Sequence, residues 1–203
     1  MEITQIIPLD SKRCKIYLEG EFAFVLYKGE LRDFGIKEGQ VIDSLVYGEI
    51  VNELLPKRCI KRAMNLLQKR DYTTGQLRDK LAEGYYTDEM IDGAIDYVTS
   101  YHYLDDERYC RDYITYHMET RSRARIIQDL TSKGLNKEFI LPIVEELYAE
   151  NDPDLEQEQI RKLLAKKHFD PETADFKERQ KMTAFLLRRG FSMSDIRKYI
   201  VTI

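Results

Sequence analysis

Three stretches of this sequence align with one another without a gap, and this internal repetition restricts the fold more than any other feature. The motifs are Leu77-x-x-x-Leu81, Ile126-x-x-x-Leu130 and Met182-x-x-x-Leu186, each followed by a glycine and a second apolar helical pattern. The second motif begins 49 residues after the first, and the third begins 56 residues after the second. A period near 50 residues is typical of stacked helical repeats, which often form extended bodies. We therefore predict a mostly α-helical chain whose repeats form an elongated curved rod.

The repeats are expected to contain three helices each. Apolar residues at three- and four-residue spacing predict helical repeats over residues 53–103, 104–150 and 151–203. Two of the second helices end in Lys133-Gly134 and Arg189-Gly190, which have the composition of helix C-termini. The last helix of the third repeat is predicted over residues 192–203.

Residues 1–52 differ from the rest of the chain. Cys14, Ile16 and Leu18 alternate with polar or aromatic residues, and short apolar runs on either side are separated by polar turns. This pattern predicts a small antiparallel β-sheet. A sheet of so few strands is only marginally stable by itself, and we therefore expect it to pack against the first long helix. Pro56 should kink or restart that helix.

Charge is unevenly distributed, although the net charge is only −4. Between Leu155 and Lys198 there are 11 Lys/Arg against 7 Asp/Glu, whereas residues 138–158 hold 8 acidic residues and no basic one. Such segregation favours oriented docking onto a charged partner, although solvated helix faces look similar. The candidate partner-binding residues, for a protein or for DNA, are Arg121, Arg123, Arg125, Lys166, Lys167, Arg188 and Arg189.

No catalytic or cofactor signature is present. The sequence lacks a nucleophile elbow, a phosphate loop, a dinucleotide-binding glycine motif and a zinc-protease helix, and its three histidines lack helical partners at ligand spacing. We therefore predict no catalytic residue, no metal, no cofactor and no enzymatic activity. The scattered Cys14, Cys59 and Cys110 are read as free thiols of a reducing compartment. With no membrane-length apolar run and no signal peptide, we expect a cytoplasmic monomer that does not enter membranes.

A helix-turn-helix DNA-binding regulator is the alternative. The segment from Gln76 to Val98 has the required spacing of two helices around a turn. Its second helix carries Asp88, Glu89 and Asp92, whose carboxylates repel phosphates. We therefore do not expect this segment to recognise a specific DNA sequence. Weak non-specific contact with DNA stays an expectation.

Three further motifs resemble those of the RecX family of bacterial recombination regulators. They are Tyr103-Leu104-Asp105-Asp106-Glu107-Arg108-Tyr109, Lys133-Gly134-Leu135 and Arg188-Arg189-Gly190-Phe191-Ser192, within a similarity that covers about residues 58–203. The first repeat departs from the pattern, because Gly84 comes one position early and Tyr85 stands where the other repeats have glycine. Residues 1–52 resemble an extension that some members carry.

The resemblance implies a non-enzymatic regulator of homologous recombination and DNA repair, linked to the SOS response. Such a protein would bind the groove of the RecA filament on single-stranded DNA and inhibit RecA strand exchange, ATPase and coprotease activities. A body that touches successive filament subunits gains affinity through effective concentration.

Overall fold

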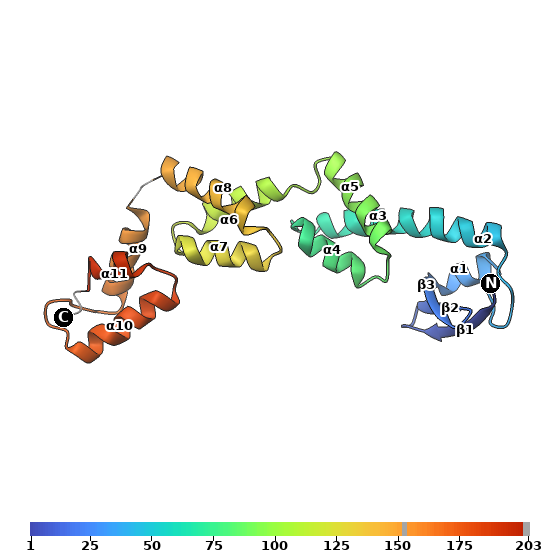
Figure 1. The fold of residues 1–203 in the computed structure, drawn as a ribbon, viewed down its shortest axis with the longest axis horizontal. Coiled ribbons are helices and arrows are strands. Elements are labelled where there is room, and N and C mark those ends of the chain that lie inside the picture. Colours follow the sequence, from blue (N-terminus) through green and yellow to red (C-terminus); the bar gives the residue numbers. More distant parts are fainter. Residues whose placement is uncertain (152–153, 201–203) are drawn as a thin grey trace. The chain divides into compact units, whose positions relative to one another are not determined.

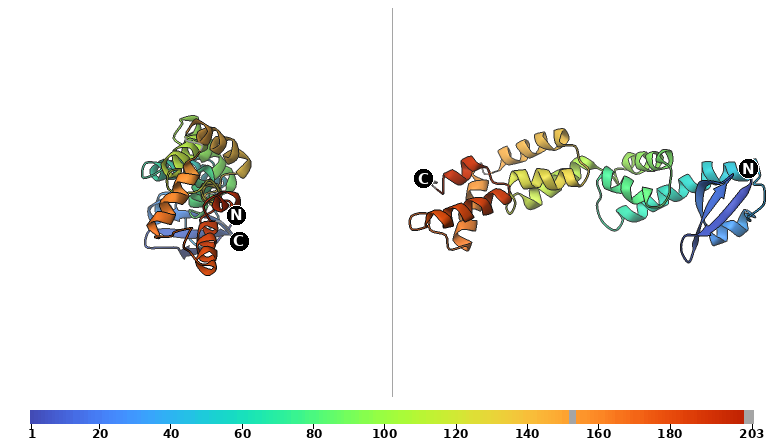
Figure 2. Two further views of the ribbon diagram at one scale, coloured as in Figure 1. Left: turned by 90° about the vertical axis from the view of Figure 1, so that its left-hand side faces the viewer. Right: turned by 60° about the horizontal axis from the view of Figure 1, so that its bottom comes forward.

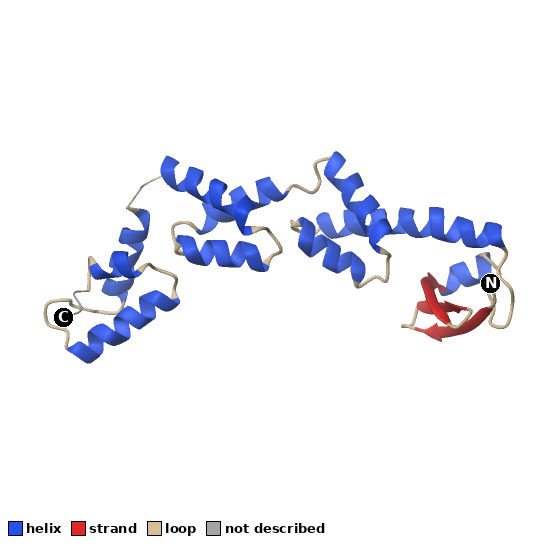
Figure 3. Ribbon diagram, viewed as in Figure 1, coloured by secondary structure: helices blue, strands red, loops and turns tan. Residues whose placement is uncertain are grey.

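The fold was analysed in a computed structural model that describes residues 1–151 and 154–200. The chain forms two compact units: unit 1 comprises Met1–Tyr72 and Gln76–Leu104, and unit 2 comprises Thr73–Gly75 with the chain from Asp105 onward. Helices make up most of both units, and the strands are confined to the N-terminal part of unit 1 (Figures 1 and 3).

The sheet of unit 1 has three antiparallel strands in the order β1 (Ile3–Pro8), β2 (Arg13–Leu18) and β3 (Glu21–Tyr27). Strand β2 alternates as predicted, with Cys14, Ile16 and Leu18 buried. These side chains pack with residues such as Ile50 and Leu55 of the following helical segment. The predicted contact between the sheet and the first long helix is therefore confirmed, and the sheet lies beside helices α1 and α2 in two views (Figures 1 and 2).

After β3 the chain continues through α1 (Lys28–Asp33), α2 (Ser44–Glu49), the π-helical segment η1 (Ile50–Leu54) and α3 (Leu55–Leu67). The last three are consecutive. Pro56 has no backbone N–H, and its ring would clash with the carbonyl four residues earlier in a regular α-helix. The wider π turn falls at this place, with the Leu55 N–H donating to the Ile50 carbonyl. The helical backbone therefore continues through Pro56, and the π turn is the irregularity found where a kink or restart was predicted.

The rest of unit 1 is a helical bundle of α3, α4 (Thr74–Ala82, from Gln76 on) and α5 (Asp88–Ser100). Cys59 and Ala63 of α3, Leu77 and Leu81 of α4, and Ile91 of α5 form its core. Thr87 caps α5 by accepting from the Met90 N–H. The apolar positions that repeat in the sequence are therefore the buried ones.

Unit 2 contains two further sets of three helices. The first is α6 (Asp106–His117), α7 (Arg123–Ser132) and α8 (Lys137–Glu150), and the second is α9 (Leu155–Lys166), α10 (Phe176–Arg188) and α11 (Met193–Arg197). Each set encloses its own apolar core, centred on Ile126 and Leu130 in one and on Leu186 and Ile196 in the other. Helix α11 is shorter than predicted, since it ends at Arg197, and the predicted residues 201–203 lie outside the described residues.

The glycine position at the end of each second helix explains the irregular first repeat. Gly134 and Gly190 have φ values of +89° and +88°, a left-handed conformation that glycine adopts without steric cost. Tyr85, at the equivalent position, has φ +63°, so the tyrosine accepts the conformation that glycine provides elsewhere. The backbone turn is thus kept although the glycine is displaced.

The mostly α-helical fold with tandem three-helix repeats and an N-terminal antiparallel sheet is confirmed. The exact domain boundaries and the elongated curved rod stay predictions.

Candidate functional site: an arginine cavity

Ser122 holds the two helical sets of unit 2 together. It precedes α7, where its hydroxyl accepts from the Arg125 N–H at 3.3 Å. The same hydroxyl donates to the backbone carbonyl of Arg189, at the end of α10, at 2.6 Å. A hydroxyl that is only 1% exposed must be hydrogen-bonded to offset its lost hydration. The Ser122–Arg189 bond therefore fixes the end of α10 beside the start of α7.

The same arrangement occurs a second time in unit 2. The buried Thr73 hydroxyl donates to the carbonyl of Lys133, which stands in the alignment where Arg189 does. A Cβ at Gly75 would lie 3.2 Å from the Gly134 Cα, and a Cβ at Gly190 would lie 2.6 Å from the Ser122 Oγ. Close backbone approach thus requires small residues at both places.

Helix α9 adds three more hydrogen bonds to the junction around Ser122. The buried Gln159 amide donates to the Met118 carbonyl at 2.5 Å and to the Arg121 carbonyl at 3.3 Å. A carboxylate oxygen of Glu156 accepts from the Arg123 N–H at 2.8 Å. Backbone groups on both sides of Ser122 are therefore held, and the arginines that project from this segment are anchored at their base.

Four arginines surround a cavity of about 360 Å³ at this junction. Arg121 precedes α7 and Arg125 lies in its first turn, whereas Arg188 ends α10 and Arg189 follows it, 63 or more residues later. Thr120, Ser122, Leu163 and Phe191 complete the lining. We call this site the arginine cavity. It brings together four of the seven residues that the sequence analysis selected.

The two pairs of arginines differ in their electrostatic environment. The Asp129 carboxylate, 13% exposed, forms ion pairs with Arg121 at 2.6 Å and with Arg125 at 3.0 Å. Among the described residues no carboxylate pairs with Arg188 or Arg189, and both are exposed. Guanidinium groups bind carboxylates and phosphates in a bidentate manner. The arginine cavity is therefore suited to an anionic group.

His117 lies close to this charge. Burial, and next the positive charge of Arg121, lower the pKa of His117 below its usual value. Both effects favour the neutral imidazole, so His117 adds little positive charge beside the cavity near neutral pH.

The remaining three selected residues do not line the arginine cavity. Arg123 stacks on the Tyr148 ring, with its guanidinium carbon 4.4 Å from the ring centroid. Lys166 is exposed in the last turn of α9. Lys167 lies 5.4 Å from the Phe185 ring, whose centroid is also 4.7 Å from the Arg189 guanidinium carbon. Lys167 and Arg189 are thus connected through one aromatic ring, while Arg123 is occupied by another.

The helix-turn-helix alternative gains nothing from the geometry of α5. Asp88, Glu89 and Asp92 are all exposed on it, and Asp92 pairs with Arg78 of α4. This helix therefore presents carboxylates where a groove-reading helix needs cations or neutral donors.

The sequence analysis missed one basic group, on α3. Lys57 and Arg58 are followed four residues later by Lys61 and Arg62, and all four line a cavity of about 510 Å³ in unit 1. Two Lys-Arg pairs at i and i+4 place four cations on one helix face, and that spacing was the available signal.

Two other kinds of site are absent from the described part of the chain. Residues 1–151 and 154–200 hold no group of three His, Cys, Asp or Glu side chains arranged to bind a metal ion. Within those same ranges, no helix has both the length and the apolar character needed to cross a membrane.

An N-terminal sheet, repeated three-helix sets and the polar junction between the two sets of unit 2 define a tandem three-helix-repeat protein. Family models match two of these sets: the third three-helix domain of RecX matches residues 154–200, and the first matches residues 59–97. The regulatory protein RecX of Caldanaerobacter subterraneus subsp. tengcongensis is 32% identical over 98% of both chains. The chain therefore belongs to the RecX family.

Other relatives differ in length. The regulatory protein RecX of Trichlorobacter lovleyi is 31% identical, and the match covers 70% of this chain but 94% of that one. A crystal structure of a regulatory protein RecX has a TM-score of 0.63 and 21% identity, with 98% of each chain covered. The RecX structure from Lactobacillus salivarius has a TM-score of 0.58 and 20% identity, with coverage of 71% of this chain and 94% of that one. These two structural likenesses concern the fold.

Proposed function

We propose that this RecX-family chain is a non-enzymatic regulator that binds the RecA recombinase filament through the arginine cavity. In this proposal it inhibits RecA strand exchange, ATPase and coprotease activities, and so acts in recombination, DNA repair and the SOS response in the bacterial cytoplasm. The relatives named regulatory protein RecX support the regulatory part.

The carrying observation is the assembly of Arg121, Arg125, Arg188 and Arg189 around one cavity. Two of these arginines are held by Asp129, and the other two are exposed. A partner that presents carboxylates or phosphates would meet the free pair first and could then exchange with Asp129. Because Ser122 fixes the backbone between the two pairs, the entropy cost of ordering on binding falls mainly on the arginine side chains.

The direct test is the ATPase rate of RecA on single-stranded DNA. The chain is expected to slow this rate at substoichiometric ratios. Arg188→Glu combined with Arg189→Glu is expected to weaken inhibition at least ~10-fold, because each reversal replaces attraction by repulsion at a charged contact. Helicity should be unchanged, since both side chains are exposed.

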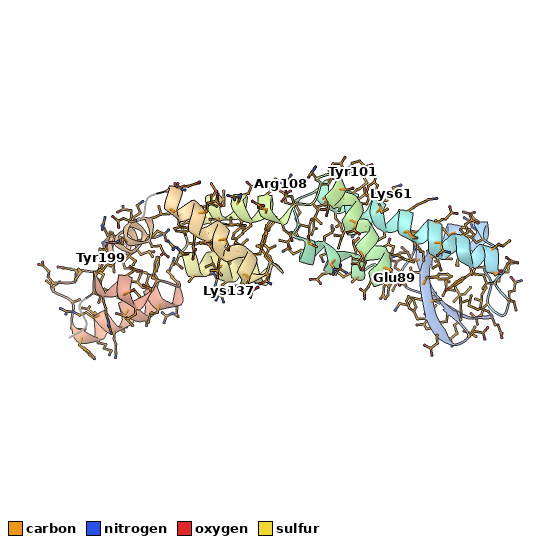
Figure 4. All side chains as sticks on the ribbon, turned by 45° about the horizontal axis from the view of Figure 1, so that its top comes forward. Lys61, Glu89, Tyr101, Arg108, Lys137 and Tyr199 are labelled. Atoms are coloured by element: carbon orange, nitrogen blue, oxygen red, sulfur yellow. The ribbon has the colours of Figure 1, made fainter. Side chains whose placement is uncertain are left out.

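A matched control is available on exposed lysines outside the cavity. Lys137→Glu with Lys177→Glu changes the charge equally and lies in the first turns of α8 and α10, where acidic residues suit the helix dipole (Figure 4 labels Lys137). Equal inhibition by both double variants would remove the arginine cavity from the contact. Normal RecA ATPase with equimolar folded wild-type chain would remove the proposed function itself.

Two associated proposals concern the free protein. We expect a monomer in sedimentation experiments, and small-angle scattering is expected to give the profile of an elongated particle. A compact, near-spherical profile would contradict the groove-docking part of the proposal.

A further inference from the structure

A second basic site lies wholly in unit 1, between the N-terminal sheet and α3. Its cavity of about 510 Å³ is lined by Tyr27, Lys57, Arg58, Lys61, Arg62 and Tyr86, together with Asn65 and Glu30. We call it the α3 groove. From the groove geometry we infer that it binds the phosphate backbone of a single-stranded nucleic acid, with a tyrosine ring available for base stacking.

Arg58 builds the groove and does not serve as a free cation. Its guanidinium donates to Glu30 at 2.8 Å and to the Val25 carbonyl at 2.5 Å. It also lies 5.2 Å from the Tyr27 ring and 5.9 Å from the Tyr86 ring. Because these partners come from β3, α1 and the loop before α5, Arg58 holds the aromatic walls beside α3.

The other cations face outward. Lys57, Lys61 and Arg62 are exposed, and Lys57 pairs with Glu53 at 2.9 Å in a contact that is 62–75% exposed. Such an exposed pair is worth little and exchanges readily with a phosphate. No carboxylate of the described residues pairs with Lys61 or Arg62. Figure 4 labels Lys61 on α3.

The spacing suits a polyanion. Lys57 and Lys61 are one helical turn apart, which corresponds to about 6 Å along α3, and Arg62 directly follows Lys61. The positive charges therefore form a row along the helix. A row of this kind follows a charged backbone better than it holds one isolated anion.

The tyrosine at the edge of the α3 groove favours a single-stranded nucleic acid over an acidic protein segment as the ligand. The Tyr27 residue is 42% exposed at the edge of the groove. Cationic grooves with open aromatic faces are the usual means of binding single strands, because every base has a face that can stack. A duplex keeps its bases stacked inside and would leave this ring unused, and an acidic peptide would need only the cations.

The test uses the full chain without RecA, so its outcome is independent of the proposed function. Fluorescence anisotropy of a labelled oligothymidylate is measured for wild type, for Lys61→Glu with Arg62→Glu, and for the control Lys137→Glu with Lys177→Glu. The first double variant is expected to bind at least ~10-fold more weakly than the control. The slope of log affinity against log salt should become shallower by about 1.4 when two phosphate contacts are lost.

The charge-reversed variant could lose affinity because it unfolds. The neutral variant Lys61→Gln with Arg62→Gln controls for this and is expected to give the same shallower slope. Affinities within twofold of the control for both variants would overturn the inference. It would also be overturned if these variants lost RecA inhibition while keeping oligonucleotide affinity, since the groove would then bind protein.

The stacking part has its own measurement. Oligonucleotides that carry 5-bromodeoxyuridine are irradiated with the wild-type chain, and the crosslinked peptides are mapped. A crosslink at Tyr27 or Tyr86 is expected. Crosslinks found only elsewhere, or tighter binding of the matched duplex at equal salt, would contradict a single strand in this groove.

Discussion

The α3 groove and the arginine cavity both gather four cations, but they are built in opposite ways. In the groove all four come from one helix, and one of them, Arg58, is consumed in holding the walls. In the cavity they come from two helical sets, and the shared Asp129 restrains two of them. The groove therefore depends on one residue that joins sheet to helix, whereas the cavity depends on the junction between repeats.

The largest effect should come from breaking the repeat junction at Gly190. Gly190→Ala places a Cβ at φ +88° and 2.6 Å from the Ser122 Oγ. The left-handed conformation costs about 1–2 kcal/mol and the overlap about 1–3 kcal/mol, so we expect a loss of about 3 kcal/mol in urea unfolding. Gly35→Ala, with φ +65° and no heavy atom within 4 Å of its Cβ, is the matched control and should cost about 1 kcal/mol.

Thiol labelling shows which unit loses stability in Gly190→Ala. Burial raises the pKa of Cys59 in unit 1 to about 12 and that of Cys110 in unit 2 to about 11, so neither is expected to react in the native chain at pH 8. Gly190→Ala should expose Cys110 at lower urea and leave Cys59 unchanged. Earlier labelling of both thiols would mean that the junction does not act on unit 2 alone.

A somewhat smaller effect is expected from Arg58→Met, which removes the charge but keeps the side-chain stem. The ion pair with Glu30 is 16–18% exposed, and its loss leaves the Glu30 carboxylate and the Val25 carbonyl without this donor. We expect a loss of about 2 kcal/mol in unit 1, measured by urea unfolding with Cys59 labelling. An unchanged unfolding midpoint would show that apolar packing alone holds the sheet on α3.

Ser122→Ala separates a capping bond from a junction bond. It removes both the cap to the Arg125 N–H and the bond to the Arg189 carbonyl, and should cost about 1.5 kcal/mol. Thr87→Ala removes only the exposed cap to the Met90 N–H and should cost about 0.5–1 kcal/mol. If the two costs were equal, the Ser122–Arg189 bond would contribute nothing to stability.

The smallest effect should come from pH. Burial lowers the pKa of His117 from its usual 6.5, so the unfolded chain binds this proton more readily than the folded one. The resulting stability is present above about pH 6.5 and is lost as the pH falls through the folded pKa. His117→Gln should reduce the difference between the urea midpoints at pH 7 and pH 5, and an unchanged difference would show that His117 does not contribute to the pH dependence.

The local structure could be predicted because it depends on patterns of residues that are close together in the sequence. Alternation at Cys14, Ile16 and Leu18 gave the sheet, and glycines after the second helices gave the repeat ends. The left-handed Tyr85 shows the limit of such patterns, since the turn persisted without its glycine.

The sites were less accessible to sequence reasoning. Arg121 and Arg189 were selected as members of basic clusters, but the Ser122–Arg189 bond that gathers their clusters joins residues 67 apart. Arg123 looked equivalent to Arg121, yet the facing Tyr148 takes up its guanidinium. Side-chain direction at a junction is a long-range property, and one short pattern does not encode it.

The π turn before Pro56 decides which sides of one long helix meet the sheet and the helical bundle. At about 100° per residue, Ile50 and Cys59 would lie about 180° apart around a regular α-helix. The extra residue of the π turn reduces this separation to about 80°, and Ile50 packs with the sheet while Cys59 packs in the helical bundle. The long helix therefore carries parts of both apolar cores on adjoining sides.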